Sequence, residues 1–177
     1  MTLEEEVDLS VKSRNSKDKM IKMDAAMALQ EMLLSAKMEG RITYGVYPSV
    51  RKLGSEPDRV MLCVHADDNA DEDVALHIHF TLMEAFCREN GIRLLKVGCH
   101  ESLAKLLHHD DDVNHHPQVD ALDNVPVAHA VQRAGTEDFV CLLVDFPKEI
   151  DAAVSCFLEH YHTMAQEMPF PRISLVS

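Results

Sequence analysis

The chain is poor in positive charge. It has 17 Lys and Arg residues against 30 Asp and Glu residues, which gives a net charge of −13 at pH 7. Binding to DNA or RNA depends mainly on cations that neutralise phosphates, and anionic membranes attract the same charge. We therefore expect no direct contact with nucleic acid and none with membranes. The negative charge favours partners with basic patches, and such contacts weaken as salt screens them.

Signals for secretion, membrane insertion and disulfide bonding are also missing. The first eight residues, Met-Thr-Leu-Glu-Glu-Glu-Val-Asp, have neither the basic stretch nor the apolar stretch of a signal peptide. No apolar run is long enough to cross a bilayer. The five cysteines are odd in number and include no C-x-x-C pair. We expect an intracellular protein with reduced thiols.

Motifs of known catalytic chemistry are absent. The chain has no G-x-S-x-G, no Walker A sequence and no G-x-G-x-x-G. Cys99 precedes His100, a setting that can lower the pKa of a thiol, but a buried and inert cysteine is the commoner case. We expect no catalytic residue, no cofactor and no enzymatic activity.

Two segments raise the question of a metal site. The run His-His-Asp-Asp-Asp-Val-Asn-His-His at 108–116 has imidazole and carboxylate groups that can hold zinc or nickel. No nearby cysteine completes a tetrahedral set there, and the acidic run at 67–73 lacks the spacing of a calcium loop. We therefore expect no bound metal.

The length and composition suit a single folded domain. Of the 177 residues, 46% are hydrophobic and 27% are charged, which is enough for a real core. Residues 1–17 are polar and predict a flexible tail, and residues 18–177 are expected to form the domain. The His-rich segment at about 108–136 lacks periodicity and predicts a flexible insertion.

Apolar patterning predicts helices that alternate with strands. Helices are expected over 20–39, 48–53, 73–90, 100–107 and 148–166. Strands are expected over 42–47, 60–64, 92–97 and 139–144, with an edge strand after the prolines of the tail at 168–176. This order predicts an α/β fold, a three-layer α/β/α sandwich.

The helix at 73–90 has apolar residues on two sides. Successive helical residues turn by about 100°. One side resembles an ordinary core face and carries Val74, Ile78, Leu82 and Ala85. The nearly opposite side carries Leu76, Phe80, Met83 and Cys87. The apolar arc spans roughly 240°, against little over 100° for a surface helix. The second side packs either on another part of the chain or on a partner.

Five carboxylates occupy seven positions at the start of this helix. They are Asp67, Asp68, Asp71, Glu72 and Asp73. Asp71 can cap the helix, and the helix dipole favours the next two acids in the first turn. Asp67 and Asp68 have no such role. A solvated loop and a docking surface for a basic partner both remain open.

This segment also resembles the signature helix of the growth-arrest and DNA-damage-inducible (GADD) stress-response family. The resemblance rests on I-H-F-T-L-x-x-A-F-C at 78–87 after the acidic loop. Shorter similar pieces are Met1-Thr2-Leu3-Glu4-Glu5, Gly45-Val46-Tyr47, Pro57-Asp58-x-Val60 and Leu62-Cys63-Val64. The resemblance covers about residues 24–107. Over residues 137–177 only the order of strand, helix and tail agrees with the family. It implies an α/β/α sandwich with a mixed sheet, similar in fold to ribosomal proteins that bind kink-turn RNA.

The resemblance implies a non-enzymatic regulator of the nucleus and cytoplasm. Family members bind and modulate protein kinases, namely mitogen-activated kinase kinase kinases and the mitotic cyclin-dependent kinase. They also bind the replication sliding clamp and a cyclin-dependent-kinase inhibitor, and they promote cell-cycle arrest, DNA repair or apoptosis.

Two sites follow from the resemblance by position. Partner docking falls on the acidic loop: Asp67, Asp68, Asp71, Glu72 and Asp73. Self-association, as a homodimer or higher homo-oligomer, falls on the long helix. For that contact the two-sided pattern nominates Leu76, Phe80, Met83 and Cys87.

Three departures from the family pattern bear on partner choice. Arg88 stands where the family has a second cysteine, which places a charge beside the nominated contact. The His-rich segment at 108–136 has no counterpart in the family, and the chain lacks the family's tryptophan. The alternative is RNA binding by analogy of fold. It would use the surface at 47–52, where only Arg51 and Lys52 are cationic.

Overall fold

The computed structural model describes residues 24–67, 73–108 and 136–175. The expected tail over 1–17 and nearly all of the expected insertion at about 108–136 lie outside these residues. Within the described ranges, no helix has both the length and the apolar character needed to span a bilayer.

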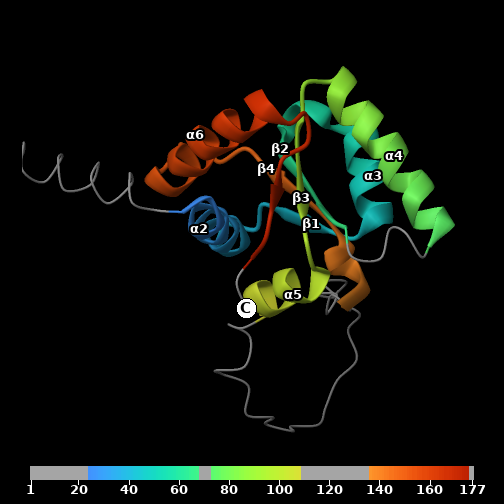
Figure 1. Cartoon of the computed structure of the whole chain (residues 1–177), viewed down its shortest axis with the longest axis horizontal. Coiled ribbons are helices and arrows are strands. Elements are labelled where there is room, and N and C mark those ends of the chain that lie inside the picture. The colour runs from blue at the N-terminus through green and yellow to red at the C-terminus, as the bar shows by residue number, and fades with distance from the viewer. Residues whose placement is uncertain (1–23, 68–72, 109–135, 176–177) are drawn as a thin grey trace, which may run out of the picture.

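Helices and strands alternate along the described chain as predicted (Figure 1). The helices are α2 (Ala25–Met38), α3 (Val46–Ser55), α4 (Val74–Glu89), α5 (His100–His108) and α6 (Ala152–Glu167). The strands are β1 (Ile42–Tyr44), β2 (Val60–Ala66), β3 (Arg93–Val97), β4 (Cys141–Asp145) and β5 (Arg172–Ile173). Two short 3-10 helices, η1 (Pro57–Arg59) and η2 (Thr136–Val140), precede β2 and β4.

The strands form one mixed sheet in the order β1-β4-β2-β3-β5. β4 runs antiparallel to β1 and β2, whereas β3 runs parallel to β2 and β5. Figure 1 shows α2 and α6 on one side of the sheet and α3 and α4 on the other. The predicted three-layer α/β/α sandwich and the expected edge strand in the C-terminal tail are confirmed.

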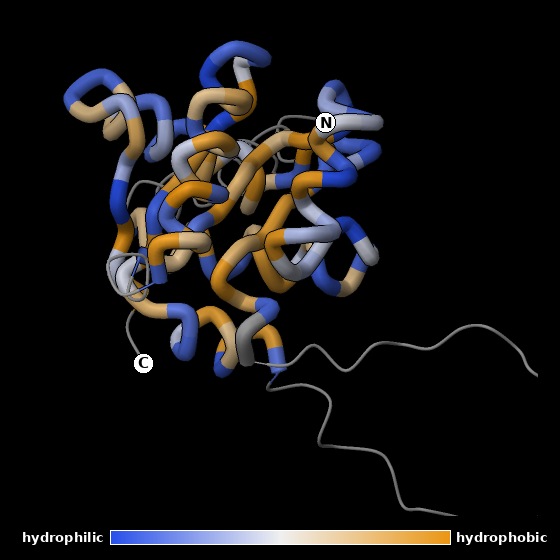
Figure 2. Tube along the Cα trace, turned by 90° about the vertical axis from the view of Figure 1, so that its right-hand side faces the viewer, coloured by the Kyte–Doolittle hydropathy of each residue, from blue (hydrophilic) through white to orange (hydrophobic). Residues whose placement is uncertain are grey.

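Two apolar cores lie on opposite faces of the sheet. Along β2, Leu62, Val64 and Ala66 pack with α2, α5 and α6. Cys63, on the other face, packs with α3 and α4. Every residue of β2 and β4 is buried, as expected of strands covered on both faces. Figure 2 shows the hydrophobic stretches gathered at the centre of the trace.

α4 faces the sheet with the side opposite to the predicted one. Phe80, Met83 and Cys87 are buried in the core with β2, β3 and β4. The expected core side is exposed instead: Val74 is 73%, Ile78 52% and Leu82 64% accessible. Of the four residues nominated for self-association, Phe80, Met83 and Cys87 are therefore not available as an open face of this fold, whereas Leu76 is half-buried.

The shape of the sheet surface explains which side of α4 is buried. β2 and β4 present small cysteine side chains at Cys63 and Cys141, which leave room for the larger Phe80 and Met83. The Phe80 ring also stacks on His65 of β2, with ring centroids 4.2 Å apart. Because protein interiors are close-packed, the side of α4 that fits this surface is the one that is buried. Helical periodicity does not show which of the two apolar sides fits.

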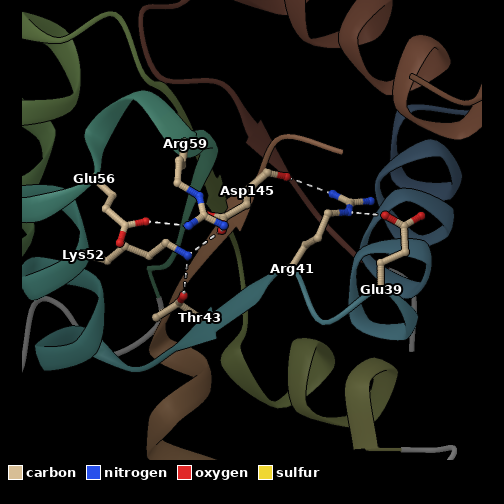
Figure 3. Close-up of polar contacts among 7 residues, drawn as sticks. All are labelled: Glu39, Arg41, Thr43, Lys52, Glu56, Arg59 and Asp145. Carbon is tan, nitrogen blue, oxygen red and sulfur yellow. Dashed lines mark hydrogen bonds and ion pairs between the residues drawn. The ribbon is translucent and has the colours of Figure 1, made fainter. Parts of the chain in front are cut away.

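A polar network joins α3 to one end of β4 (Figure 3). Lys52 Nζ lies 2.6 Å from Asp145 Oδ2, and Arg41 Nη1 donates to the Asp145 carbonyl oxygen over 2.9 Å. Arg59 also reaches the Asp145 carboxylate, at 3.8 Å. Because Lys52 is half-buried and neutralises a buried acid, Arg51 is the exposed cation of the two at 47–52. This weakens the RNA-binding alternative.

The sheet edge beside β3 is closed partly by a side chain. β5 pairs only with Lys96 and Val97. Further along β3, the Tyr161 hydroxyl of α6 accepts from Leu94 N at 3.1 Å and donates to Leu94 O at 3.2 Å. Burial raises the pKa of Tyr161, so the hydroxyl keeps the proton that it donates. The contact satisfies backbone groups that a longer fifth strand would otherwise pair.

The predicted strand over 42–47 ends three residues early. Gly45 has φ of 91°, a conformation that L side chains rarely adopt, and α3 begins at the next residue. A Cβ at Gly45 would lie only 3.2 Å from Asp138 Oδ1. The turn places α3 beside α4 on the same face of the sheet.

The orientation of α4 predicts very different costs for two truncations on this helix. Phe80→Ala removes a buried ring and should lower the free energy of unfolding by about 3–5 kcal/mol. Leu82→Ala removes an exposed side chain and should change it by no more than about 0.5 kcal/mol. Urea unfolding of dilute protein measures both. Equal losses would show that α4 is not oriented as described.

Candidate protein-interaction surface

An exposed apolar surface covers the outer sides of α3 and α4. It consists of Val74, Ile78 and Leu82 from α4 with Tyr47 and Val50 from α3, all of them exposed. We call these five residues the α3/α4 surface. A monomer of this size normally exposes apolar side chains singly, and a group of them on two adjacent helices indicates a contact site.

A groove between the two helices adds depth to this surface. It consists of two hollows of about 260 Å³ and 360 Å³, and both are lined by Val50 and His79. The first is completed by Leu53, Gly54, Leu82, Met83 and Phe86. The second is completed by Val46, Tyr47, Asp73, Ala75 and Leu76. Side chains of a partner can therefore insert between α3 and α4.

Two of the five acids predicted for docking are described, and each has a structural role. Asp73 is the N-cap of α4: its Oδ1 accepts from Ala75 N at 2.9 Å and Leu76 N at 3.1 Å. The helix is therefore capped by Asp73 and not by Asp71. Asp67 forms an ion pair with Arg172 of β5. Asp68, Asp71 and Glu72 lie outside the described residues.

The acidic segment and the groove adjoin at Asp73. This residue is exposed and lines the second hollow beside Leu76 and His79. A partner that filled the groove would therefore meet negative charge at the N-terminal end of α4. The acids and the apolar excess of α4 were predicted from the sequence, but the side nominated for contact is largely buried.

Arg88 does not place its charge on the α3/α4 surface. Its guanidinium carbon lies 5.1 Å from the centroid of the Phe170 ring, in the segment before β5. Lys96 Nζ lies 5.9 Å from the same centroid and forms an ion pair with Glu84 at 2.8 Å. The predicted conflict between Arg88 and a contact on α4 is therefore removed, because this charge belongs to the packing of the C-terminal segment.

A buried cluster that was not predicted from the sequence lies beneath α4. Potential ligand atoms of Cys63, His65 and Cys141 all lie within 4.8 Å of one another. Hydrogen bonding to Cys63 lowers the pKa of Cys141, while hydrogen bonds to Cys141 and Cys87, together with burial, raise the pKa of Cys63. The C-x-H spacing in β2 was an available signal, because residues two apart in a strand share a face.

The fold and the exposed surface together define a class of protein. It is a small, acidic α/β/α sandwich with an apolar groove beside a negatively charged segment, which is suited to contact with other proteins. Comparison with known sequences then identifies the family.

The similar sequences are growth arrest and DNA damage-inducible proteins. GADD45 gamma of Rattus norvegicus is 49% identical over 89 residues, which cover 50% of this chain and 56% of that protein. The chain thus spans little more than half the length of the gamma relatives it matches. GADD45 beta of Bos taurus is 42% identical over 108 residues, 60% of this chain and 64% of that protein. No protein-family model matches the chain.

A longer match establishes membership. GADD45 alpha of Mus musculus is 38% identical over 149 residues, which cover 80% of this chain and 83% of that protein. The chain belongs to the GADD45 family of growth arrest and DNA damage-inducible stress-response proteins. The resemblance found in the sequence is confirmed, and the match extends beyond the 24–107 region that carried it.

The capping geometry predicts that Asp73 can lose its charge without loss of stability. Asp73→Ala removes the acceptor for two backbone N–H groups and should lower the free energy of unfolding by about 1 kcal/mol. Asp73→Ser retains a capping oxygen and should lie within about 0.5 kcal/mol of wild type. Chemical denaturation measures both. If the serine variant is as unstable as the alanine variant, charge and not capping is the role of Asp73.

Proposed function

We propose that this protein is a non-enzymatic stress-response regulator that binds and modulates protein kinases. The expected targets are mitogen-activated kinase kinase kinases and the mitotic cyclin-dependent kinase. The replication sliding clamp and a cyclin-dependent-kinase inhibitor are further proposed partners. Acting in the nucleus and cytoplasm, the protein would promote cell-cycle arrest, DNA repair or apoptosis.

The observation that carries the proposal is the exposed groove between α3 and α4 with Asp73 at its edge. An apolar groove can provide affinity through burial, and a charged rim can provide steering and partner choice. Membership of the GADD45 family supports the same reading.

Kinase docking is assigned to the acidic loop: Asp67, Asp68, Asp71, Glu72 and Asp73. The net charge of −13 gives the whole chain a field that attracts a basic surface. Asp73 places one of the five acids at the edge of the groove. Docking by this loop should therefore weaken as salt rises.

Self-association is assigned to the α3/α4 surface and replaces the earlier nomination on the buried side of α4. Two copies can place Ile78 and Leu82 of one chain against the same residues of the other, as in a two-fold interface. The two chains repel each other through their net charge, so added salt should favour this contact. The opposite responses to salt distinguish self-association from kinase docking.

The kinase proposal is tested by neutralising the five loop acids. The variant combines Asp67→Asn, Asp68→Asn, Asp71→Asn, Glu72→Gln and Asp73→Ser, the last to preserve the helix cap. Its affinity for a purified mitogen-activated kinase kinase kinase should fall at least about tenfold, because each exposed ion pair contributes up to ~1 kcal/mol. Calorimetry or surface plasmon resonance at several salt concentrations provides the measurement.

A control variant removes five acids elsewhere, by Asp110→Asn, Asp111→Asn, Asp112→Asn, Asp120→Asn and Asp123→Asn. It should keep most of the affinity if the position of the charge matters. Equal losses in the two variants would mean that only net charge acts. An unchanged affinity in the loop variant would exclude the loop as the docking site.

Self-association is tested with charge placed on the exposed side of α4. Ile78→Glu and Leu82→Glu should convert a wild-type dimer to monomer while the fold remains intact, because both side chains are exposed in the monomer. Met27→Glu, at an exposed apolar residue of α2 on the opposite side of the sheet, should remain dimeric. Sedimentation velocity over a range of concentrations decides. A monomeric wild type at all concentrations would reject the contact.

A further inference from the structure

Three potential metal ligands meet in the core beneath α4, and a fourth lies in the same core. Cys63 and His65 lie on one face of β2, and His65 is the direct cross-strand partner of Cys141 on β4. Cys87 of α4 lies in the same apolar core as Cys63 and Cys141, and it is one of the groups that raise the pKa of Cys63. All four residues are buried. Three thiols and one imidazole thus come from three elements that are far apart in the sequence.

The spacing of these groups is close to that of a tetrahedral site. The ligand atoms of Cys63, His65 and Cys141 lie within 4.8 Å of one another, and His65 Nε2 is 3.3 Å from Cys63 Sγ. Around zinc, with bonds of about 2.3 Å to sulfur and 2.0–2.1 Å to nitrogen, neighbouring ligand atoms lie roughly 3.5–3.8 Å apart. Small side-chain adjustments suffice to bring these three atoms to such distances, and Cys87 would have to turn toward them to complete the set.

The polar groups around the cluster are incompletely satisfied. His65 Nδ1 and Ser49 Oγ are buried and have no hydrogen-bond partner among the described residues. Ser49 also lies close enough to influence Cys141, so its hydroxyl could donate to a metal-bound thiolate. A buried polar group without a partner costs free energy, and purely apolar packing of this core would have avoided that cost.

The chemistry of the donors selects the cation. Thiolate and imidazole are the ligands of zinc and similar d10 ions, whereas magnesium and calcium require oxygen. Two thiolates and a neutral imidazole balance a divalent charge in a buried site. A third thiolate leaves one negative charge, which the Ser49 hydroxyl is placed to stabilise.

We propose that Cys63, His65, Cys141 and Cys87 form a structural Cys3His site for Zn²⁺. The ion joins β2 and β4 to α4 and fixes the buried side of that helix. Because the site is enclosed, the ion enters during folding, as in other structural zinc sites. This site is separate from the His-rich segment at 108–116 and does not depend on the proposed kinase docking.

The test uses the full chain, unfolded and refolded under reducing conditions with one equivalent of Co²⁺ or Zn²⁺. Cobalt should give a thiolate-to-metal charge-transfer band and the intense visible bands of tetrahedral coordination, at one ion per chain. Zinc should displace it and raise the melting temperature.

His65→Leu places an apolar side chain in an apolar core, so it should fold. Loss of a residue that only supports a metal ligand costs about 10–100-fold in metal affinity. Because His65 is proposed as a ligand itself, His65→Leu should bind cobalt at least about 100-fold more weakly than wild type.

Two controls isolate the cluster. Cys156→Ser changes a buried cysteine that packs in the opposite core, and it should retain the charge-transfer band. Replacement of His108, His109, His115 and His116 by glutamine should also retain it. The proposal is overturned if refolded wild type shows no charge-transfer band, or if folded His65→Leu binds cobalt as tightly as wild type.

Discussion

The central sheet is apolar on both faces, and the need to cover both faces determines the rest of the structure. α2, α5 and α6 cover one face, and α3 and α4 cover the other. A helix can turn only one side toward a sheet. Since α4 is apolar on two sides, burying Phe80, Met83 and Cys87 leaves Val74, Ile78 and Leu82 exposed. The surface assigned to protein contact is therefore a consequence of the way in which the core is closed.

Patterning predicted the layers but not the orientation of α4. The apolar runs at 60–64 and 139–144 indicated strands buried on both faces, and the structure has β2 and β4 there. For α4, two apolar arcs made periodicity ambiguous. The choice depends on contacts across the sheet, where Phe80 stacks on His65 above two small cysteines. Such contacts join residues distant in sequence, so no local pattern could have revealed them.

The charged residues show how structural and functional roles overlap. Lys52 appeared as a surface cation in the sequence, but it is held by Asp145 at 2.6 Å. Asp73 appeared as one acid of a docking loop, but it also caps α4. The sequence shows that a residue is charged, but it does not show which group that residue contacts in the fold. Variants that preserve one role and remove the other are therefore needed to separate stability from binding.

The buried and exposed sides of α4 are energetically linked. Any interaction that holds Cys87 against Cys63 also holds Ile78 and Leu82 outward, because the helix turns as a rigid body. Asp73 fixes the first turn, and Arg88 packs on Phe170 near the last turn. A ligand that binds only this orientation stabilises it by mass action. A cation bound by the thiol cluster would thus stabilise the orientation of α4 in which the α3/α4 surface is exposed, without contacting that surface. This would connect the least accessible part of the molecule to the surface proposed to meet partners.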